Sequence, residues 1–136
     1  MPSPTITFTD VTSAVGLANV NAARICVADL NNDDRPDIIV SRSSVYLNRM
    51  DDKNPNGFSF EKIESSLVGP GNDGVAVFVD LDEDGTVDAF VVKYFDDKRI
   101  AERTAKDDQS PYAWWQRGHG DGTFDPPIAV HAMGPK

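Results

Sequence analysis

The side chains best suited to chemistry are acidic, and they gather in two nine-residue segments, 29–37 and 80–88. Together these 18 of the 136 residues hold 9 of the 22 acidic side chains. Carboxylates this close repel one another unless a positive charge lies among them. A divalent cation is the obvious source of that charge, so both segments are candidate metal loops.

The two segments follow one pattern, with an oxygen-bearing side chain at positions 1, 3, 5 and 9 and Leu at position 2. Calcium prefers six to eight oxygen ligands at about 2.3–2.6 Å, and alternate side chains of a tight loop can converge on one centre. Position 7 would add a backbone carbonyl. We therefore predict about two Ca²⁺ per chain, held by Asp29, Asn31, Asp33, Arg35 and Asp37 in the first loop and by Asp80, Asp82, Asp84, Thr86 and Asp88 in the second.

Position 6 distinguishes the loops. Gly85 permits the left-handed backbone that such a loop needs, and Asp34 adopts it at a cost of about 1 kcal/mol. Because Asn31 also lowers the ligand charge, we expect weaker binding in the first loop. An EF-hand is excluded, since position 12 is Val40 or Val91 rather than Glu. The alternative for either loop is an acidic hairpin turn without metal.

The loops belong to a longer repeat, because their first residues lie 51 positions apart and apolar runs flank each of them. Phe8, Phe60 and Phe124 mark equivalent places, and residues 46–48 match residues 114–116. Two such units indicate propeller blades or a related array. We predict an all-β chain of two four-stranded units and one leading strand, with strands near 5–9, 24–28, 37–41, 44–48, 58–63, 74–79, 88–93, 112–116 and 124–131.

The second unit carries an insertion over residues 94–111 that is rich in charged residues. A short helix is expected near residues 98–106, and the remainder is typical of a surface loop. The insertion is either a solvated excursion or a loop that binds a partner.

The formal net charge of −9 argues against nucleic acid and anionic membrane surfaces as partners. No apolar run is long enough to enter a membrane, and no signal peptide is predicted at the N-terminus. The single cysteine, Cys26, excludes an intrachain disulfide and is expected to be a small residue of a buried strand.

The loop pattern between two apolar strands resembles the calcium loop of FG-GAP/VCBS repeats. The resemblance covers most of residues 6–130, and it departs from the family at Asp34, where Gly is usual, and at the insertion. The segments that carry it are 8–12 with 16–17, 27–33, 35–40, 45–48 and 120–124. Two matching loops in one chain make the signal specific.

This resemblance implies four-stranded antiparallel β-propeller blades, as in integrin α-subunit heads and propeller lectins. Residues 1–136 would form one partial propeller, with blade one at about 12–64, blade two at about 68–132 and the leading strand from a preceding blade. The family's calcium ions are structural and its members are mostly extracellular or periplasmic. Since two blades do not close a ring, we expect a fragment of a longer propeller or self-association, and the missing signal peptide fits a fragment.

Two functions remain open. The first is a calcium-stabilised structural or ligand-recognition module, adhesive or lectin-like, binding a glycan or a protein through residues that the sequence does not identify. Tyr112, Trp114 and Trp115 are its aromatic candidates, although packing between blades is the preferred explanation for them. The second is a catalytic or non-catalytic fragment of a larger propeller enzyme. We expect no enzyme, because neither His119 nor His131 has a nucleophile or a zinc spacing nearby.

Overall fold

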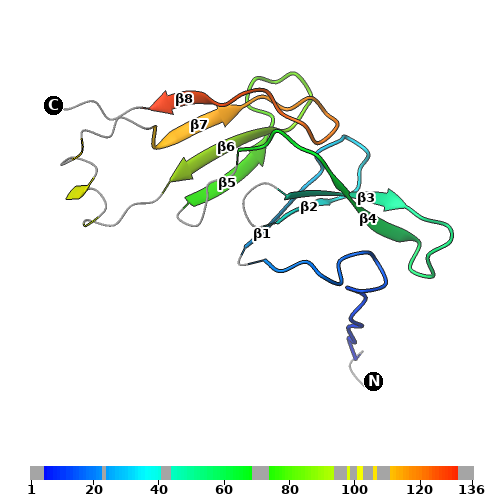
Figure 1. Ribbon diagram of the computed structural model, residues 1–136. Coiled ribbons are helices and arrows are strands. Elements are labelled where there is room, and N and C mark those ends of the chain that lie inside the picture. Colours follow the sequence, from blue (N-terminus) through cyan, green and yellow to red (C-terminus); the bar gives the residue numbers. More distant parts are fainter. Residues whose placement is uncertain are drawn as a thin grey trace.

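The computed structural model describes residues 5–22, 24–40, 44–68, 74–93, 98, 101–102, 106 and 111–131. Two four-stranded antiparallel sheets form this part of the chain, each with its strands in sequence order (Figure 1). β-Branched and aromatic residues fill the strands, and Asx and Gly residues fill the turns between them. The first sheet contains β1 (Ile25–Ala28), β2 (Asp37–Val40), β3 (Ser44–Met50) and β4 (Phe58–Ile63), and the second contains β5 (Gly74–Val79), β6 (Asp88–Lys93), β7 (Ala113–Gln116) and β8 (Ile128–His131).

The predicted all-β fold of two four-stranded antiparallel units is confirmed, but the predicted leading strand at residues 5–9 is wrong. Residues 5–10 form no ladder, and Phe8 is 94% exposed. A strand needs a partner along its length. The chain after this segment contacts the outer edge of β4 at one point, where the Phe60 amide donates to the Val15 carbonyl at 2.8 Å.

Most of the predicted insertion, 94–111, lies outside the described residues. Lys98, Ala101 and Glu102 are helical, and the Lys106 amide donates to the Glu102 carbonyl at 3.2 Å, in the place where a short helix was expected. Within the described ranges, no helix is apolar and long enough to cross a membrane.

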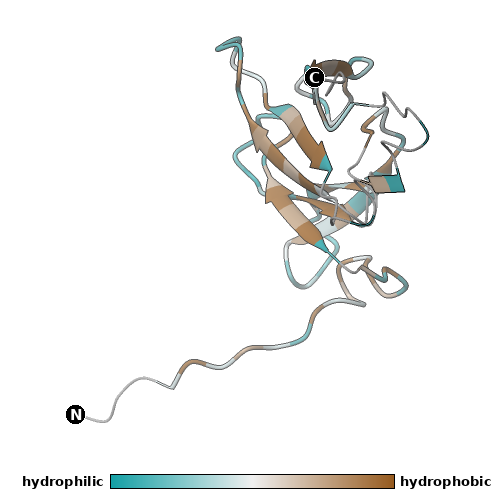
Figure 2. Cartoon of the chain, turned by 90° about the vertical axis from the view of Figure 1, so that its left-hand side faces the viewer, coloured by the Kyte–Doolittle hydropathy of each residue, from teal (hydrophilic) through white to brown (hydrophobic). Residues whose placement is uncertain are grey.

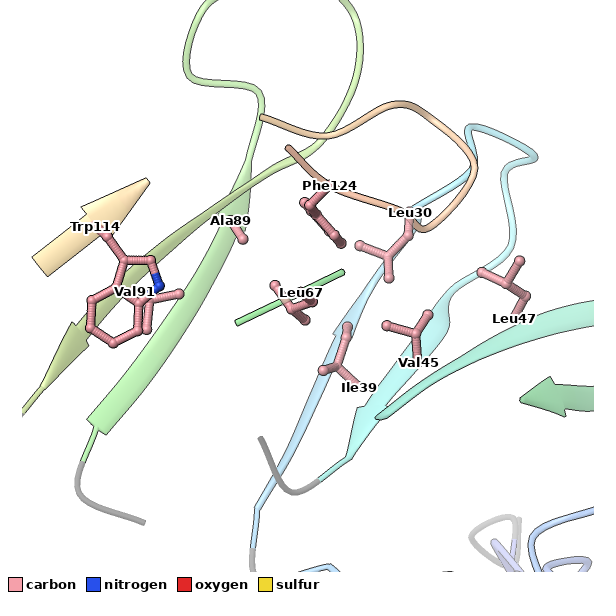
Figure 3. Packing of buried hydrophobic residues seen from close by; sticks show 9 residues of the cluster. All are labelled: Leu30, Ile39, Val45, Leu47, Leu67, Ala89, Val91, Trp114 and Phe124. Carbon is pink, nitrogen blue, oxygen red and sulfur yellow. The ribbon is translucent and has the colours of Figure 1, made fainter. Parts of the chain in front are cut away.

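One apolar cluster lies between the two sheets (Figure 3). Trp114 points into this cluster, whereas Trp115 lies on the opposite face of β7, as the two-residue period of a strand requires. Cys26 is half-buried and packs against the cluster, but the buried strand predicted around it is wrong, because its neighbours Ile25 and Val27 are 60% and 62% exposed. The buried members are Leu30, Ile39, Val45, Leu47, Leu67, Ala89, Val91, Trp114 and Phe124.

The two sheets repeat the same strand pairing, 51 residues apart. Cys26 pairs with Ile39 in β1–β2, and Val77 pairs with Phe90 at the equivalent place in β5–β6. The third strands are offset from the sequence-based match, because Ile38 pairs with Tyr46 whereas Ala89 pairs with Gln116. Tyr46 therefore corresponds to Gln116, and the predicted equivalence of residues 46–48 with 114–116 is wrong by two positions.

The sheets bury opposite faces of this common pattern. Ile39 is buried at 6% exposure, whereas its counterpart Phe90 is only half-buried, and the fully buried Ala89 has the half-buried Ile38 as its counterpart. Two sheets related by a two-fold axis would bury the same positions. The first sheet thus packs one face on the opposite face of the second, a head-to-tail arrangement.

Candidate metal centre

The loop between β5 and β6 brings three of its predicted ligands together. Asp80, Asp82 and Asp88 each offer one carboxylate oxygen, and these three oxygens lie within 4.8 Å of one another. Asp88 is fully buried, Asp80 is half-buried and Asp82 is exposed. The cluster therefore reaches from the sheet interior to the surface. Among the residues that the structure describes, no other group of three or more His, Cys, Asp or Glu side chains brings its ligand atoms this close together.

Asp80 shapes the loop by accepting two backbone hydrogen bonds, from the amide of Asp84 at 3.1 Å and that of Gly85 at 2.9 Å. The loop turns through two left-handed residues, Glu83 with φ 59° and Gly85 with φ 88°. The left-handed Gly85 was predicted from the sequence, but the left-handed Glu83 was not. Both turns fold the backbone around the Asp80 carboxylate.

Asp88 joins the loop to the third strand. Its carboxylate accepts from the amide of Leu81 at 3.0 Å and from that of Gly118, just after β7, at 2.9 Å. Gly118 is required there because a Cβ atom at this position would lie 2.0 Å from the Val87 carbonyl oxygen. The sequence spacing gave no sign of Gly118, since it lies 30 residues beyond Asp88.

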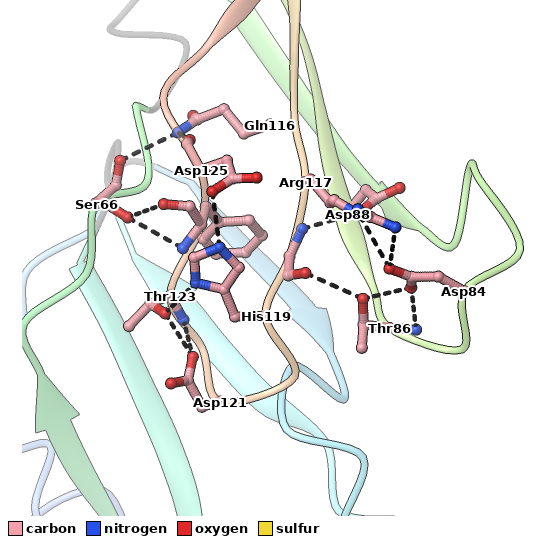
Figure 4. Close-up of polar contacts among 12 residues, drawn as sticks. Ser66, Asp84, Thr86, Asp88, Gln116, Arg117, His119, Asp121, Thr123 and Asp125 are labelled. Carbon is pink, nitrogen blue, oxygen red and sulfur yellow. Dashed lines mark hydrogen bonds and ion pairs between the residues drawn. The ribbon is translucent and has the colours of Figure 1, made fainter.

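Asp84 does not belong to the carboxylate cluster and pairs instead with Arg117, which lies outside the loop (Figure 4). The Arg117 guanidinium contacts it at 2.9 Å and also contacts Asp82 at 2.9 Å. The Thr86 hydroxyl and amide donate to Asp84 at 2.6 and 2.8 Å and hold its pKa below the ordinary value, and Asp82 raises the pKa of Arg117. The hydroxyl of Thr86 also lies 3.1 Å from the Gly118 carbonyl oxygen.

The first loop repeats this framework. Asp29 accepts from the amides of Asp33 at 3.2 Å and Asp34 at 2.9 Å, as Asp80 does in the second loop. Asp34 is left-handed with φ 62°, as predicted, and Asn32 is left-handed with φ 56°. The framework thus forms without glycine at position 6.

Asp37 is fully buried in the first loop, as Asp88 is in the second. It accepts from the amides of Leu30 and Asn48, both at 2.8 Å. Burial raises the pKa of Asp37 above the ordinary value, although both amides lower it. Asn48 occupies the place of Gly118, which fixes the two-residue offset between the third strands.

The other predicted ligands of the first loop interact with one another. The Arg35 guanidinium lies 2.5 Å from Asp33, and the Asn31 side-chain amide donates to the same carboxylate at 2.8 Å. The Asn31 side-chain oxygen is buried and receives no hydrogen bond from any described residue. Asp29, Asp33 and Asp37 do not form a group of three oxygens within 4.8 Å in the described part of the chain. Arg35 was predicted as a carbonyl ligand, and its backbone amide and its guanidinium both donate to Asp33.

The two loops lie side by side, because the Asn32 side-chain amide donates to the Gly85 carbonyl at 2.6 Å. Each loop therefore contacts its counterpart through residues next to the predicted ligands.

The turn after β7 contains His119, whose ring makes two polar contacts within the turn (Figure 4). The exposed His119 ring lies 3.0 Å from the Thr123 hydroxyl and 2.9 Å from Asp125. The Thr123 hydroxyl in turn donates to Asp121 at 2.6 Å, so its proton is not directed at the histidine. This arrangement is a hydrogen-bonded turn. The side chain of His131 lies outside the described residues.

Gln116, the last residue of β7, joins the same turn to the segment 66–68 by hydrogen bonds. It is fully buried, and its side-chain amide donates to the carbonyls of Ser66 at 3.1 Å and Asp125 at 2.8 Å, while its oxygen accepts from the Val68 amide at 2.7 Å. All of its polar atoms are thus paired, which the cost of burying an unpaired amide requires.

No family model, curated protein or solved structure matches the chain.

Proposed function

We propose that the chain is a calcium-binding β-propeller repeat module in which the metal is structural. The observation that carries this proposal is the convergence of Asp80, Asp82 and Asp88 around the second loop. The donors are all oxygen atoms, the set that Ca²⁺ prefers, and no His or Cys accompanies them. These residues fit the ion and would hold it between β5 and β6.

The contacts of Asp88 support a structural rather than a catalytic role. This carboxylate already joins the loop backbone at Leu81 to the end of β7 at Gly118. A bound cation would offset the repulsion among the three carboxylates and thereby stabilise three strands at once. A binding free energy that exists only in the folded state adds to stability.

The first loop is proposed as the weaker site. Its donor set is less anionic, since Asn31 replaces an acid, and Arg35 already neutralises Asp33. The buried, unpaired oxygen of Asn31 is nevertheless a suitable ligand, because a buried acceptor without a partner is unfavourable. We therefore assign this loop to Ca²⁺ with lower affinity.

The repeated strand pairing supports the propeller-blade part of the proposal. Identical registers in β1–β2 and β5–β6, combined with head-to-tail packing, are the relation between neighbouring units of a propeller or array. In this proposal blade one spans about 12–64 and blade two about 68–132, in an extracellular or periplasmic protein where calcium is plentiful.

The module would serve as a scaffold or bind a glycan or a protein on its surface. Trp114 is removed from the aromatic candidates because it is buried in the core at 5% exposure. Tyr112 and Trp115 are half-buried and remain candidates. We propose no catalytic residue.

Calorimetric titration of Ca²⁺ into chelator-treated protein tests the metal assignment. We expect uptake that approaches two ions per chain, with a rise in melting temperature. Asp82→Asn should lower the affinity of the tighter site on the order of tenfold, because it removes one of the three converging carboxylates, and Asp82 is the exposed one of the three. Asp52→Asn, in the exposed β3–β4 turn, removes the same charge and should leave binding unchanged. Absence of heat and of any shift in melting temperature would exclude the metal.

A further inference from the structure

One face of the second sheet is apolar and open. Val75, Val77 and Val79 on β5 are 53%, 51% and 43% exposed, and Ile128 and Val130 on β8 are 55% and 54% exposed. Strand pairing places Phe90, Val92 and Trp115 on the same face, and Val92 is 37% exposed. We call these eight residues the outer face of the second sheet. Adjacent exposed side chains of this size on one face mark an interaction surface.

In the first sheet, the equivalent face is already covered. Val77 and Phe90 correspond to Cys26 and Ile39, which pack against the core between the sheets. Val45, the counterpart of Trp115, is fully buried there. The second sheet therefore exposes the positions through which the first sheet packs on its neighbour. Figure 2 colours the chain by hydropathy, and most of the length of its strands is brown, the hydrophobic end of the scale.

The first sheet has a partly open face of the complementary kind, on which the β1 side chains are exposed although Val40 of β2 is buried. Ile25 and Val27 on β1 are 60% and 62% exposed. Their counterparts in the second sheet are Ala76 and Phe78, which pack against the core. We call the face that contains Ile25, Val27, Ile38 and Tyr46 the outer face of the first sheet. The chain thus presents, at its two open faces, the two unlike sides of its own internal interface.

We propose that the outer face of the second sheet binds the outer face of the first sheet of another copy of this chain. The contact would continue the internal sheet-to-sheet interface from one copy to the next. The proposal rests on the blade interpretation given above but not on calcium. A second copy is the favoured occupant because this chain itself carries the matching face.

The association is head-to-tail, since the two contacting faces differ. Such contacts close into a ring if the rotation per copy permits and otherwise extend into a filament. A two-fold dimer would instead pair one face with itself. This difference gives the proposal a sharp test.

The test uses Val77→Glu and Val27→Glu, which place a charge on one outer face each. Both side chains are exposed, so the isolated chain should keep its fold, checked by circular dichroism and melting temperature. Sedimentation velocity should show wild-type assemblies and monomers of either variant alone. An equimolar mixture should form a one-to-one dimer, because each variant retains the face that the other lacks. Lys53→Gln, in the β3–β4 turn, makes the same change in net charge and should assemble like the wild type.

Three outcomes would overturn the proposal. The wild-type chain could stay monomeric at its highest soluble concentration, one of the two variants could assemble like the wild type, or the mixture could remain monomeric. Repeating the measurement in chelator and in calcium separates this proposal from the metal assignment. Assembly without calcium uptake refutes only the metal, and uptake by a strict monomer refutes only the assembly.

Discussion

Arg117 provides a positive charge next to the carboxylates of the second loop. Its guanidinium contacts Asp82 and Asp84, so it neutralises the loop and also competes with a cation for the same carboxylates. A unit charge a few ångströms from a metal site changes binding by about 1 kcal/mol, or roughly fivefold in affinity.

Arg117→Gln should therefore strengthen calcium binding about fivefold while lowering the melting temperature in chelator. Calorimetry and thermal unfolding measure the two effects. Arg49→Gln removes an exposed arginine that pairs with Glu61 on the first sheet, and it should change neither quantity appreciably. Weaker calcium binding by Arg117→Gln would contradict the competition.

Asp121 reports on the turn beside the loops. The Thr123 hydroxyl is the main cause of its lowered pKa, followed by the Thr123 amide. A carboxyl whose pKa is lowered on folding stabilises the protein above the unfolded pKa, and that stabilisation is lost as the pH falls through the folded pKa.

Thr123→Ala should raise the pKa of Asp121 toward its ordinary value, measured by carboxyl-carbon NMR titration. Its stability deficit relative to the wild type should be present at neutral pH and should narrow as the pH falls below about 4. An unchanged pKa of Asp121 would contradict the main role of the Thr123 hydroxyl.

At the scale of elements, the crossing of the β7 end over the second loop depends on Gly118. We expect Gly118→Ala to destabilise the protein by about 3 kcal/mol or more, because the new Cβ would overlap the Val87 carbonyl oxygen. Gly57→Ala is the control, since Gly57 is left-handed with φ 77° but has open space around it, so the cost should be about 1 kcal/mol. Urea unfolding compares the two, and equal losses would show that the contact with the Val87 carbonyl oxygen does not set the cost at Gly118.

The strands were largely predictable because short β-branched runs alternate with Asx and Gly turns. Two predictions about the fold were wrong for identifiable reasons. Residues 5–9 have the composition of a strand but no ladder partner, and composition alone cannot supply one. The third-strand match followed aromatic residues, whereas the register follows the backbone amides of Asn48 and Gly118 that donate to the buried aspartates.

The site was predictable only where its contacts are local. Regular spacing placed Asp80, Asp82 and Asp88 in one loop, and the structure brings them together. Arg117 reaches Asp84 from 33 residues away, so no local pattern could contain that contact. Position 4 of each loop is left-handed without glycine, which residue type alone does not indicate.

At the scale of the whole molecule, the acidic charge has a definite place. The formal charge of −9 is concentrated at two loops that touch, while the open sheet faces carry valine and isoleucine. Charge and apolar surface are therefore separated on this chain. That separation lets metal binding and assembly be tested independently.

The hydrogen bond from Asn32 to the Gly85 carbonyl joins the tips of the two loops. With calcium bound as proposed, an ion that orders one tip would change the conformational freedom of the other through this bond. Thermodynamic linkage would make the effect reciprocal, so that occupancy of either loop would shift the affinity of its neighbour by the same factor. The pair of loops would behave as one cooperative unit instead of two independent sites.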